Sequence, residues 1–535
     1  MLFDAAALMT SVALGPVAEA FGVHEISSQV IVISQVDPSY IPLPDTPPLP
    51  FITPDQAASS QITTRALQQL SRLPSTAIAG FVRSHPDLVT EMLANPPAST
   101  EVTRWWGHLD FESRVALRGA TPELVGNLNG IPYGVRDLAN RVVLTTTIAR
   151  LESVIDSSAG RTVIENAKQQ LAMLQSISDA LGDLGDEAEP KRSLMTLDVS
   201  GQGRASIILG DLRNADYVTY LVPGMFFTIE NQMGDWVDAS ARLYDEQLSW
   251  LALLGPGEAA GGATSVTAAS SADGTSAQST SADGSATSSA AATSSPAATS
   301  SAAAVSSPAA TSSAAPASSP AATSSTASAA GVTETVATIA WIGYPTPNLT
   351  NVGGIENAYE GRDSLAGDIE GLQALRGDDE PYITVVAHSY GSTAALMALT
   401  EGEFSIDALA MVGSPGSPAK SVDDLHVRNG NVWVGEAAWD PIPNSAYFGS
   451  DPGSASYGAK PLGVNGGRDS LTEQALKAST GHNEYFSPGT ESMRNFALIG
   501  IGHGDYVSNG DDSISIAAPG AGKAVRAAAK GSATS

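Results

Sequence analysis

A serine in a strand–turn–helix context is the first feature of the sequence that could do chemistry. A buried-strand run over 382–387 leads into Ala-His-Ser-Tyr-Gly, with Ser389 at its centre, and then into a run of helix formers. Such a turn lifts a serine hydroxyl clear of a sheet and aims a helix N-terminus at developing negative charge. Small residues must flank the serine two positions away; Gly391 is one, and Ala387 stands where glycine is usual. Ser389 is therefore predicted to be a nucleophile.

A serine of this kind needs a base, which should follow both the serine and an acid along the chain. The sequence has seven histidines. His482 lies in a glycine-bearing loop ahead of a helix, where the base belongs, and His503 is the reserve. His388 adjoins the serine and is expected to point elsewhere and to support the turn. We therefore predict that His482 activates Ser389.

The acid that orients this base should lie in a loop after a later strand. Asp440 follows the strand-like run 431–434, in a loop that two prolines would stiffen. Asp440 is the predicted acid, and the fallbacks are Glu436 and Asp451.

Acyl transfer at a serine also needs two backbone N–H groups for the oxyanion. One should belong to Tyr390, and the other should come from the loop after an earlier strand. The run 217–222 ends in such a loop, so the second donor is assigned to Met225 or Phe226. Together with Phe227, these residues either line a pocket for the acyl group or pack in the core.

Two further runs carry a family resemblance. They are 105–109, with its paired tryptophans, and 126–141, which reads Gly-Asn-Leu-Asn-Gly-Ile-Pro-Tyr-Gly-Val-Arg-Asp-Leu-Ala-Asn-Arg. With the serine turn, Trp-Asp-Pro at 439–441 and Gly-His-Asn-Glu-Tyr at 481–485, the chain resembles the actinobacterial α/β-hydrolase family catalogued as DUF1023. The resemblance covers about 105–502 without the low-complexity tract. It implies a hydrolase fold with the triad Ser389, Asp440 and His482, and no agreed substrate.

The 127–141 run has two interpretations. Its Gly, Asn and Pro residues predict a structured loop before a helix that begins near Val135 or Asp137. Its polar side chains either brace the helical region against the sheet or contact substrate. The bracing set would be Arg136, Asp137, Asn140 and Arg141; the substrate-contacting set would be Asn127, Asn129 and Arg136.

The elements that must position these residues alternate between strands and helices. Short β-branched runs occupy 204–209, 217–222, 336–341, 382–387, 408–412 and 431–434. Helical periodicity covers 228–254 and, as two long helices broken near 157–160, most of 140–182. Alternation of this kind predicts a mostly parallel sheet with helices on both faces, and hence an α/β-hydrolase fold.

The predicted division of the chain follows from these patterns. It comprises an irregular proline-rich N-terminus (1–55), a helical region that is a candidate lid (56–195), an α/β-hydrolase domain (196–260 and 332–507), a disordered insertion (261–331) and a disordered tail (508–535). The insertion is almost entirely Ala, Ser, Thr, Pro and Gly, which cannot bury enough apolar surface to fold. It is either an O-glycosylated stalk or an unmodified spacer. It joins a helix end to a strand start, opposite the edge where ligands bind, so it should not gate the site.

Composition excludes several classes of function. The formal net charge of −29 argues against nucleic acid and anionic membranes as partners. The chain has no cysteine, which excludes disulfides and thiolate catalysis. No apolar run is long enough for a transmembrane helix. The proposed chemistry requires neither metal nor organic cofactor, and nothing in the sequence indicates an oligomeric state.

The N-terminus bears on localisation. Residues 5–20 are mildly apolar and end in Ala-Glu-Ala, like a signal-peptidase site, but Asp4 and Pro16 interrupt the segment and no basic residue precedes it. An ordinary amphipathic segment, and with it a cytoplasmic location, is favoured over secretion or attachment to the cell envelope.

The predicted function is hydrolysis of a small or lipid-like ester by an acyl-enzyme route. Two alternatives stay open. One is an acyltransferase that uses the same triad, and the other is a non-catalytic, envelope-associated binding protein on a hydrolase scaffold.

Overall fold

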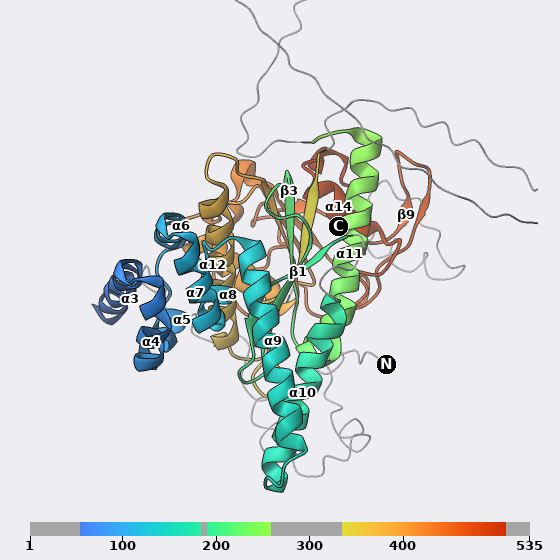
Figure 1. Cartoon of the computed structure of the whole chain (residues 1–535). Coiled ribbons are helices and arrows are strands. Elements are labelled where there is room, and N and C mark those ends of the chain that lie inside the picture. Colours follow the sequence, from blue (N-terminus) through green and yellow to red (C-terminus); the bar gives the residue numbers. More distant parts are fainter. Residues whose placement is uncertain (1–53, 183–189, 258–333, 444, 510–535) are drawn as a thin grey trace, which may run out of the picture. The chain divides into compact units, whose positions relative to one another are not determined.

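An eight-stranded sheet lies at the centre of the described chain (Figure 1). The computed structural model describes residues 54–182, 190–257, 334–443 and 445–509. The strand order is β1-β2-β4-β3-β5-β6-β7-β8; β1 and β2 are antiparallel to their neighbours and the remaining pairs are parallel. The strands are β1 (Arg192–Asp198), β2 (Arg204–Gly210), β3 (Tyr217–Val222), β4 (Val336–Ile342), β5 (Tyr382–His388), β6 (Ala408–Val412), β7 (Val432–Gly435) and β8 (Lys460–Pro461). A separate two-stranded sheet pairs β9 (Gly467–Arg468) with β10 (Ala475–Leu476).

Helices precede, separate and follow these strands. They are α3 (Pro54–Arg72), α4 (Ser75–Ser84), α5 (Pro86–Ala94), α6 (Ser99–His108), α7 (Phe111–Ala120), α8 (Pro122–Asn127), α9 (Tyr133–Ile155), α10 (Arg161–Leu181), α11 (Ile229–Leu254), α12 (Glu356–Arg376), α13 (Tyr390–Glu401) and α14 (Glu491–Gly500). Short 3-10 helices occupy Val422–Asp424, Arg428–Gly430 and Gly504–Tyr506.

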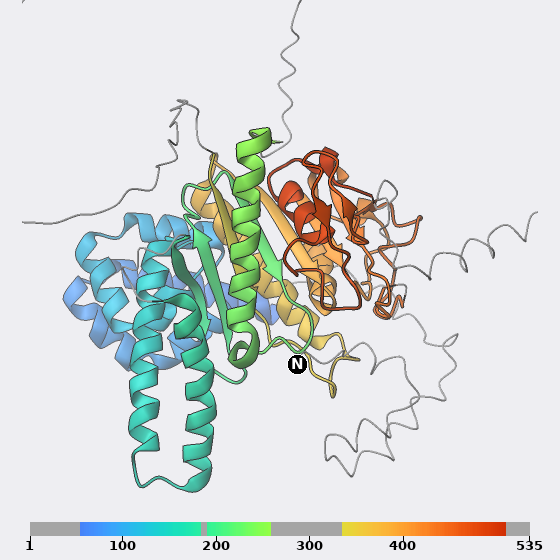
Figure 2. The same ribbon diagram turned by 90° about the vertical axis from the view of Figure 1, so that its right-hand side faces the viewer.

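Helices cover both faces of the sheet (Figures 1 and 2). On one face, α10, α11 and α14 form a core with the sheet that includes Trp236 and Phe496. On the other, α12 and α13 form a second core that includes Leu365 and Leu396. The predicted fold class, a mostly parallel sheet between two helical layers, is confirmed.

The connections predict a ligand-binding crevice at the carboxyl ends of β3 and β5. The chain leaves β3 through α11 on one face and leaves β5 through α13 on the other. The two strands are hydrogen-bonded neighbours in which Val222 pairs with Ala387. Ligands of open α/β sheets bind where neighbouring strands connect in opposite directions. Ser389 lies one residue beyond β5, and therefore at this crevice.

The helices α3 to α8 form a third core of their own, around Trp106 and Leu124. Within the described residues, this group contacts α9, β1 and α12. Asn129 packs against Gly367 and Gly371 in the second half of α12. This half of the helix leads to the start of β5, at the edge of the sheet opposite Ser389. These contacts place the helical region beside β1 and α12 and give no support to its interpretation as a lid.

The helical hairpin is present, with one correction at its start. α9 and α10 pack together as two consecutive helices (Figure 2), and the break falls at 156–160. However, α9 begins at Tyr133, and not near Val135 or Asp137. Pro132 has φ −54° and accepts hydrogen bonds from the N–H groups of Val135 and Arg136, so the first turn forms directly after the proline.

The boundaries differ from the predicted ones at three places. α3 begins at Pro54, inside the segment predicted to be irregular. β1 begins at Arg192, before the predicted end of the helical region, because this run pairs with β2. Ser508 is ordered, although the tail was predicted to start there, because its carbonyl accepts from Gly463 N–H at 2.7 Å.

The remaining segment predictions lie outside the described residues. They concern the proline-rich N-terminus before residue 54, the whole of the low-complexity insertion and the tail after residue 509. Among the described helices, none combines the length and apolar character needed to cross a membrane.

Candidate active site

The turn at Ser389 has the strained backbone that its context predicts. Ser389 has φ 54° and ψ −132°, a conformation that non-glycine residues rarely adopt, directly before α13. A Cβ atom on Gly391 would lie 2.2 Å from the carbonyl oxygen of Pro223, so only glycine fits there. The methyl group of Ala387 is buried in the core beneath α12 and α13, which accommodates it in place of the usual glycine.

Three side chains from separate loops meet at this turn. The Ser389 hydroxyl donates to Nε2 of His482 across 2.6 Å. Nδ1 of His482 lies 2.9 and 3.0 Å from the two carboxylate oxygens of Asp440. Because the Asp440 carboxylate accepts a hydrogen bond from Nδ1–H, the imidazole carries its proton on Nδ1. The lone pair on Nε2 then faces the Ser389 hydroxyl. This arrangement suits removal of the hydroxyl proton during nucleophilic attack.

Two further donors hold Asp440. The Tyr485 hydroxyl donates to its Oδ2 at 2.7 Å, and the N–H of Ile442 donates to its Oδ1 at 3.0 Å. Burial alone would raise the pKa of Asp440, but the hydrogen bonds and charge of His482, together with these two donors, outweigh burial and lower it. The acid therefore stays ionised beside the imidazole.

The sequence interpretation gave Tyr485 no role. Burial and the neighbouring carboxylate raise the pKa of its phenol far above the usual value, so the hydroxyl remains a donor to Asp440. The same hydroxyl accepts from the N–H of Ala437 at 2.9 Å, which ties the loop after β7 to the histidine loop. Tyr485 could have been singled out from the sequence, because it lies three residues after His482 and inside the run that carries the family resemblance.

His388 lies against the base. Its Nε2–H donates to the backbone carbonyl of His482 at 2.7 Å, and the two rings lie 4.7 Å apart. It therefore supports the histidine loop as well as the turn, and it does not point away from the site as predicted. Burial, followed by the effect of His482, lowers the pKa of His388 to about 3. His388 is therefore neutral at physiological pH and adds no charge beside the imidazole that must become positive.

The buried His388 makes stability depend on pH. The unfolded chain takes up a proton near the ordinary value of 6.5, whereas the folded protein does so only near pH 3. The free energy of unfolding should therefore fall as the pH drops from about 6.5 to about 3. His388→Gln, whose amide N–H can replace the donor at Nε2 but does not titrate, should flatten the fall in this window. Urea denaturation over a pH series measures both slopes, and equal slopes would refute the assignment.

The loop after β3 lies beside the nucleophile. A Cβ atom on Gly224 would be 2.5 Å from Cβ of Ser389 and 3.1 Å from its Oγ. Within the described residues, the N–H of Met225 makes no hydrogen bond with another backbone group. Tyr390 is the first residue of α13, where N–H groups have no acceptor inside the helix. Met225 and Tyr390 thus remain the candidate oxyanion donors.

Phe226 does not fit the donor role predicted for it. Its N–H donates to the carbonyl of Pro347 at 3.0 Å, which joins this loop to the one after β4. Phe227 packs edge-on against Trp236, with ring centroids 4.8 Å apart, and is partly buried against the core.

The contact at Gly224 predicts a variant that impairs the site without replacing Ser389, His482 or Asp440. In Gly224→Ala, the added methyl group would collide with Cβ of Ser389, so one of the two backbones must move. We expect kcat/KM to fall about 10²-fold, the usual effect of displacing a catalytic group by an ångström. Gly234→Ala on α11 is the matched control, because its new Cβ would meet no atom within 4 Å. Wild-type kinetics in the Gly224 variant would contradict the proposed geometry.

Asn127 lies away from this site, and the bracing interpretation of its segment holds. Its side-chain amide donates to the carbonyl of Leu197 in β1 and accepts from the N–H of the same residue. Asn140 donates to the carbonyls of Leu194 and Met195, and Asp137 accepts from Leu194 N–H at 2.7 Å. These contacts anchor the helical region to β1, the edge strand that lies farthest along the sheet from β5.

The reserve residues have other partners. His503 Nε2 lies 3.0 Å from the carbonyl of Gly255, and Asp451 accepts from the N–H of Gly453. The Glu436 carboxylate lies close to Gly453 as well. None of them is hydrogen-bonded to the serine or to His482 in the described structure.

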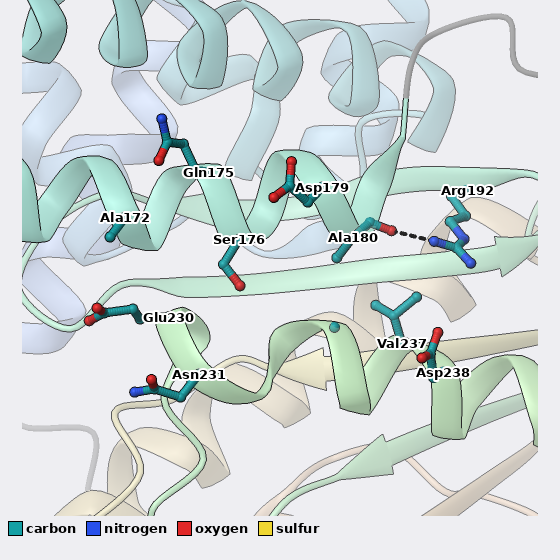
Figure 3. Close-up of a pocket in the computed structure, with 11 residues that line it drawn as sticks. Ala172, Gln175, Ser176, Asp179, Ala180, Arg192, Glu230, Asn231, Val237 and Asp238 are labelled. Atoms are coloured by element: carbon teal, nitrogen blue, oxygen red, sulfur yellow. Dashed lines mark hydrogen bonds between the residues drawn. The ribbon is translucent and has the colours of Figure 1, made fainter.

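A polar groove of about 560 Å³ lies between α10, α11 and the start of β1 (Figure 3). Its lining includes Asp179, Glu230 and Asp238, and Arg192, which donates to the carbonyl of Ala180 at 2.7 Å. The hydroxyl of Ser176 donates to the carbonyl of Ile229. With no base beside this serine among the lining residues, the groove does not bring together the chemistry found at Ser389.

Known proteins resemble this chain in part. A family model described as "Alpha/beta hydrolase" matches residues 296–450, which include Ser389 and Asp440. Uncharacterized protein Rv2079 of Mycobacterium tuberculosis is 26% identical over 471 residues, or 78% of this chain and 58% of that protein. Uncharacterized protein Mb0988c of Mycobacterium bovis is 31% identical over 140 residues, or 25% of this chain and 51% of that protein.

The chain thus spans somewhat more than half the length of the curated relatives it matches. No solved structure matches it significantly. The chain has an α/β-hydrolase fold, and this fold with the family match suggests hydrolase activity.

Proposed function

We propose that the protein is a serine esterase that cleaves carboxylic esters through an acyl-enzyme intermediate. The observation that carries the proposal is the continuous chain of hydrogen bonds from Ser389 through His482 to Asp440. The strained turn at the serine and the ionised state of the acid add to it. The resemblance to the DUF1023 family is consistent with this triad.

The proposed reaction has two halves. The Ser389 hydroxyl attacks the ester carbonyl carbon as its proton passes to Nε2 of His482, giving a tetrahedral oxyanion. The N–H groups of Tyr390 and Met225 stabilise the oxyanion, and Asp440 balances the imidazolium. Collapse breaks the bond to the alkoxide, which takes the proton from His482. Water, deprotonated by the same imidazole, then attacks the acyl-enzyme and releases the acid and Ser389.

Product analysis separates the proposal from its closest alternative. The purified protein should hydrolyse p-nitrophenyl esters to the free acid, and an added alcohol should not divert most of the acyl group to a new ester. A predominant ester product would assign an acyltransferase with the same triad. Absence of both products across short and long chains would favour a binding protein on this scaffold.

A further inference from the structure

Several loop segments around Ser389 carry almost no charge, in contrast to the rest of the chain. Charged residues make up 16% of the sequence, and the net charge is −29. Segments of the loops after β3, β4, β6 and β7, at 223–229, 343–355, 413–419 and 437–443 with 445–450, contain one charged residue, Asp440. Its side chain is fully buried against His482, so these segments present no charged side chain to solvent. The remaining parts of the loops after β6 and β7 carry Lys420, Asp423, Asp424, Arg428, Glu436 and Asp451. Charged residues border these segments directly, namely Glu230, Glu356, Lys420, Glu436 and Asp451.

The same loops expose large apolar side chains. Trp439 is 89% exposed, Tyr447 58% and Leu349 56%. Trp439 is the most exposed large hydrophobic side chain of the described residues, and its backbone has φ 65°. An exposed tryptophan in an unfavourable backbone conformation does not stabilise the fold. Its place beside the triad acid is typical of a contact surface.

These loops are joined to one another above the nucleophile turn. The Tyr447 hydroxyl lies close to Gly353 in the loop that carries Leu349. The Tyr390 hydroxyl donates to the carbonyl of Gly354 in this loop at 2.8 Å, and its ring packs edge-on against Phe448. Since Tyr390 directly follows the nucleophile, the uncharged surface is continuous with the site.

The nucleophile itself is enclosed, since Ser389 is only 3% exposed. A substrate must therefore pass between these loops to reach the hydroxyl. A charged group would lose its hydration there without meeting a counter-ion, whereas each buried methylene of an aliphatic chain is favourable. The strong negative charge of the chain, in turn, disfavours approach to an anionic lipid surface.

We propose that this uncharged surface, defined by Leu349, Trp439 and Tyr447, docks on a neutral lipid phase and passes long-chain acyl esters to Ser389. The inference rests on the proposed esterase function. It narrows the substrate to esters of long aliphatic acids taken from an uncharged lipid surface. Soluble short-chain esters are then poor substrates, because they react with the triad but make no contact with the apolar surface.

Chain-length selectivity tests the substrate part of this proposal. With p-nitrophenyl esters below their critical micelle concentrations, kcat/KM should rise about ten-fold or more from acetate to decanoate, because each buried methylene can contribute up to about four-fold. Trp439→Asn, which suits the positive φ, and Tyr447→Ser should lower decanoate turnover by a larger factor than acetate turnover. A preference for acetate, or equal losses on both esters in both variants, would overturn the proposal.

Vesicle flotation tests the docking part without catalysis. The Ser389→Ala protein should float with phosphatidylcholine vesicles and less with vesicles containing phosphatidylglycerol. Replacing Trp439 or Tyr447 should reduce flotation, whereas Phe111→Ser, which removes a 74% exposed side chain from α7, should not. If the wild type cleaves esters but the protein does not float with either kind of vesicle, the docking proposal is wrong and the esterase proposal is unaffected. If it floats but cleaves no ester, the esterase is wrong and docking stands.

Discussion

Ser389→Ala should abolish ester hydrolysis while leaving the fold intact. The Ser389 hydroxyl lies 2.6 Å from Nε2 of His482, and it makes no side-chain hydrogen bond that caps α13. We expect kcat to fall about 10⁵-fold or more, with residual turnover supplied by the oxyanion donors. Steady-state kinetics with one p-nitrophenyl ester, combined with thermal unfolding, measures both effects.

The matched control for this variant is Ser249→Ala. Ser249 is exposed on α11, and its hydroxyl donates only to the carbonyl of Asp245 within its own helix. It should retain wild-type kcat and KM. Turnover by Ser389→Ala within ten-fold of the wild type would assign the nucleophile elsewhere, and a matching loss in Ser249→Ala would show that the assay reports stability.

Asp440→Asn should have the second largest effect. The carboxylate accepts the Nδ1–H of His482 and fixes the tautomer that presents a lone pair to Ser389. An asparagine amide can donate to Nδ1, which would move the imidazole proton to the nitrogen that must accept from the serine. We expect kcat to fall about 10⁴-fold at neutral pH with KM little changed.

Tyr485→Phe provides the graded comparison. It removes one of the donors to Asp440 but leaves the carboxylate bound to His482 and to the N–H of Ile442. Its loss of kcat should be clearly smaller than that of Asp440→Asn. Because the Tyr485 hydroxyl helps to lower the pKa of Asp440, that pKa should be higher in this variant. If Asp440→Asn were no slower than Tyr485→Phe, the acid would lie elsewhere.

Local patterns were enough to find the residues that the structure brings together at the turn. A strand run, a small-residue turn and a helix run are contiguous around Ser389, so their geometry follows from short-range rules. Asp440 and His482 could be found because loops after parallel strands share one edge of the sheet. Most strand limits agree within one or two residues for the same reason, since β-branched runs bounded by Gly or Pro mark them.

Contacts between distant segments could not be found in this way. The hydrogen bond from Phe226 N–H to the carbonyl of Pro347 depends on how two loops pack, and it removes a donor that the sequence allowed. Asn127 is an ordinary polar loop residue by sequence, and only its pairing with β1 gives it a structural role. The contact of His388 with the histidine loop likewise joins residues 94 positions apart.

Active-site labelling followed by peptide mass spectrometry tests the central claim most directly. A fluorophosphonate should react stoichiometrically with the full chain at neutral pH, and fragmentation should place the adduct on Ser389. Labelling should be lost in Ser389→Ala and strongly slowed in Asp440→Asn. An adduct on another residue, or equal labelling of the Ser389→Ala protein, would contradict the assignment of Ser389 as the activated nucleophile.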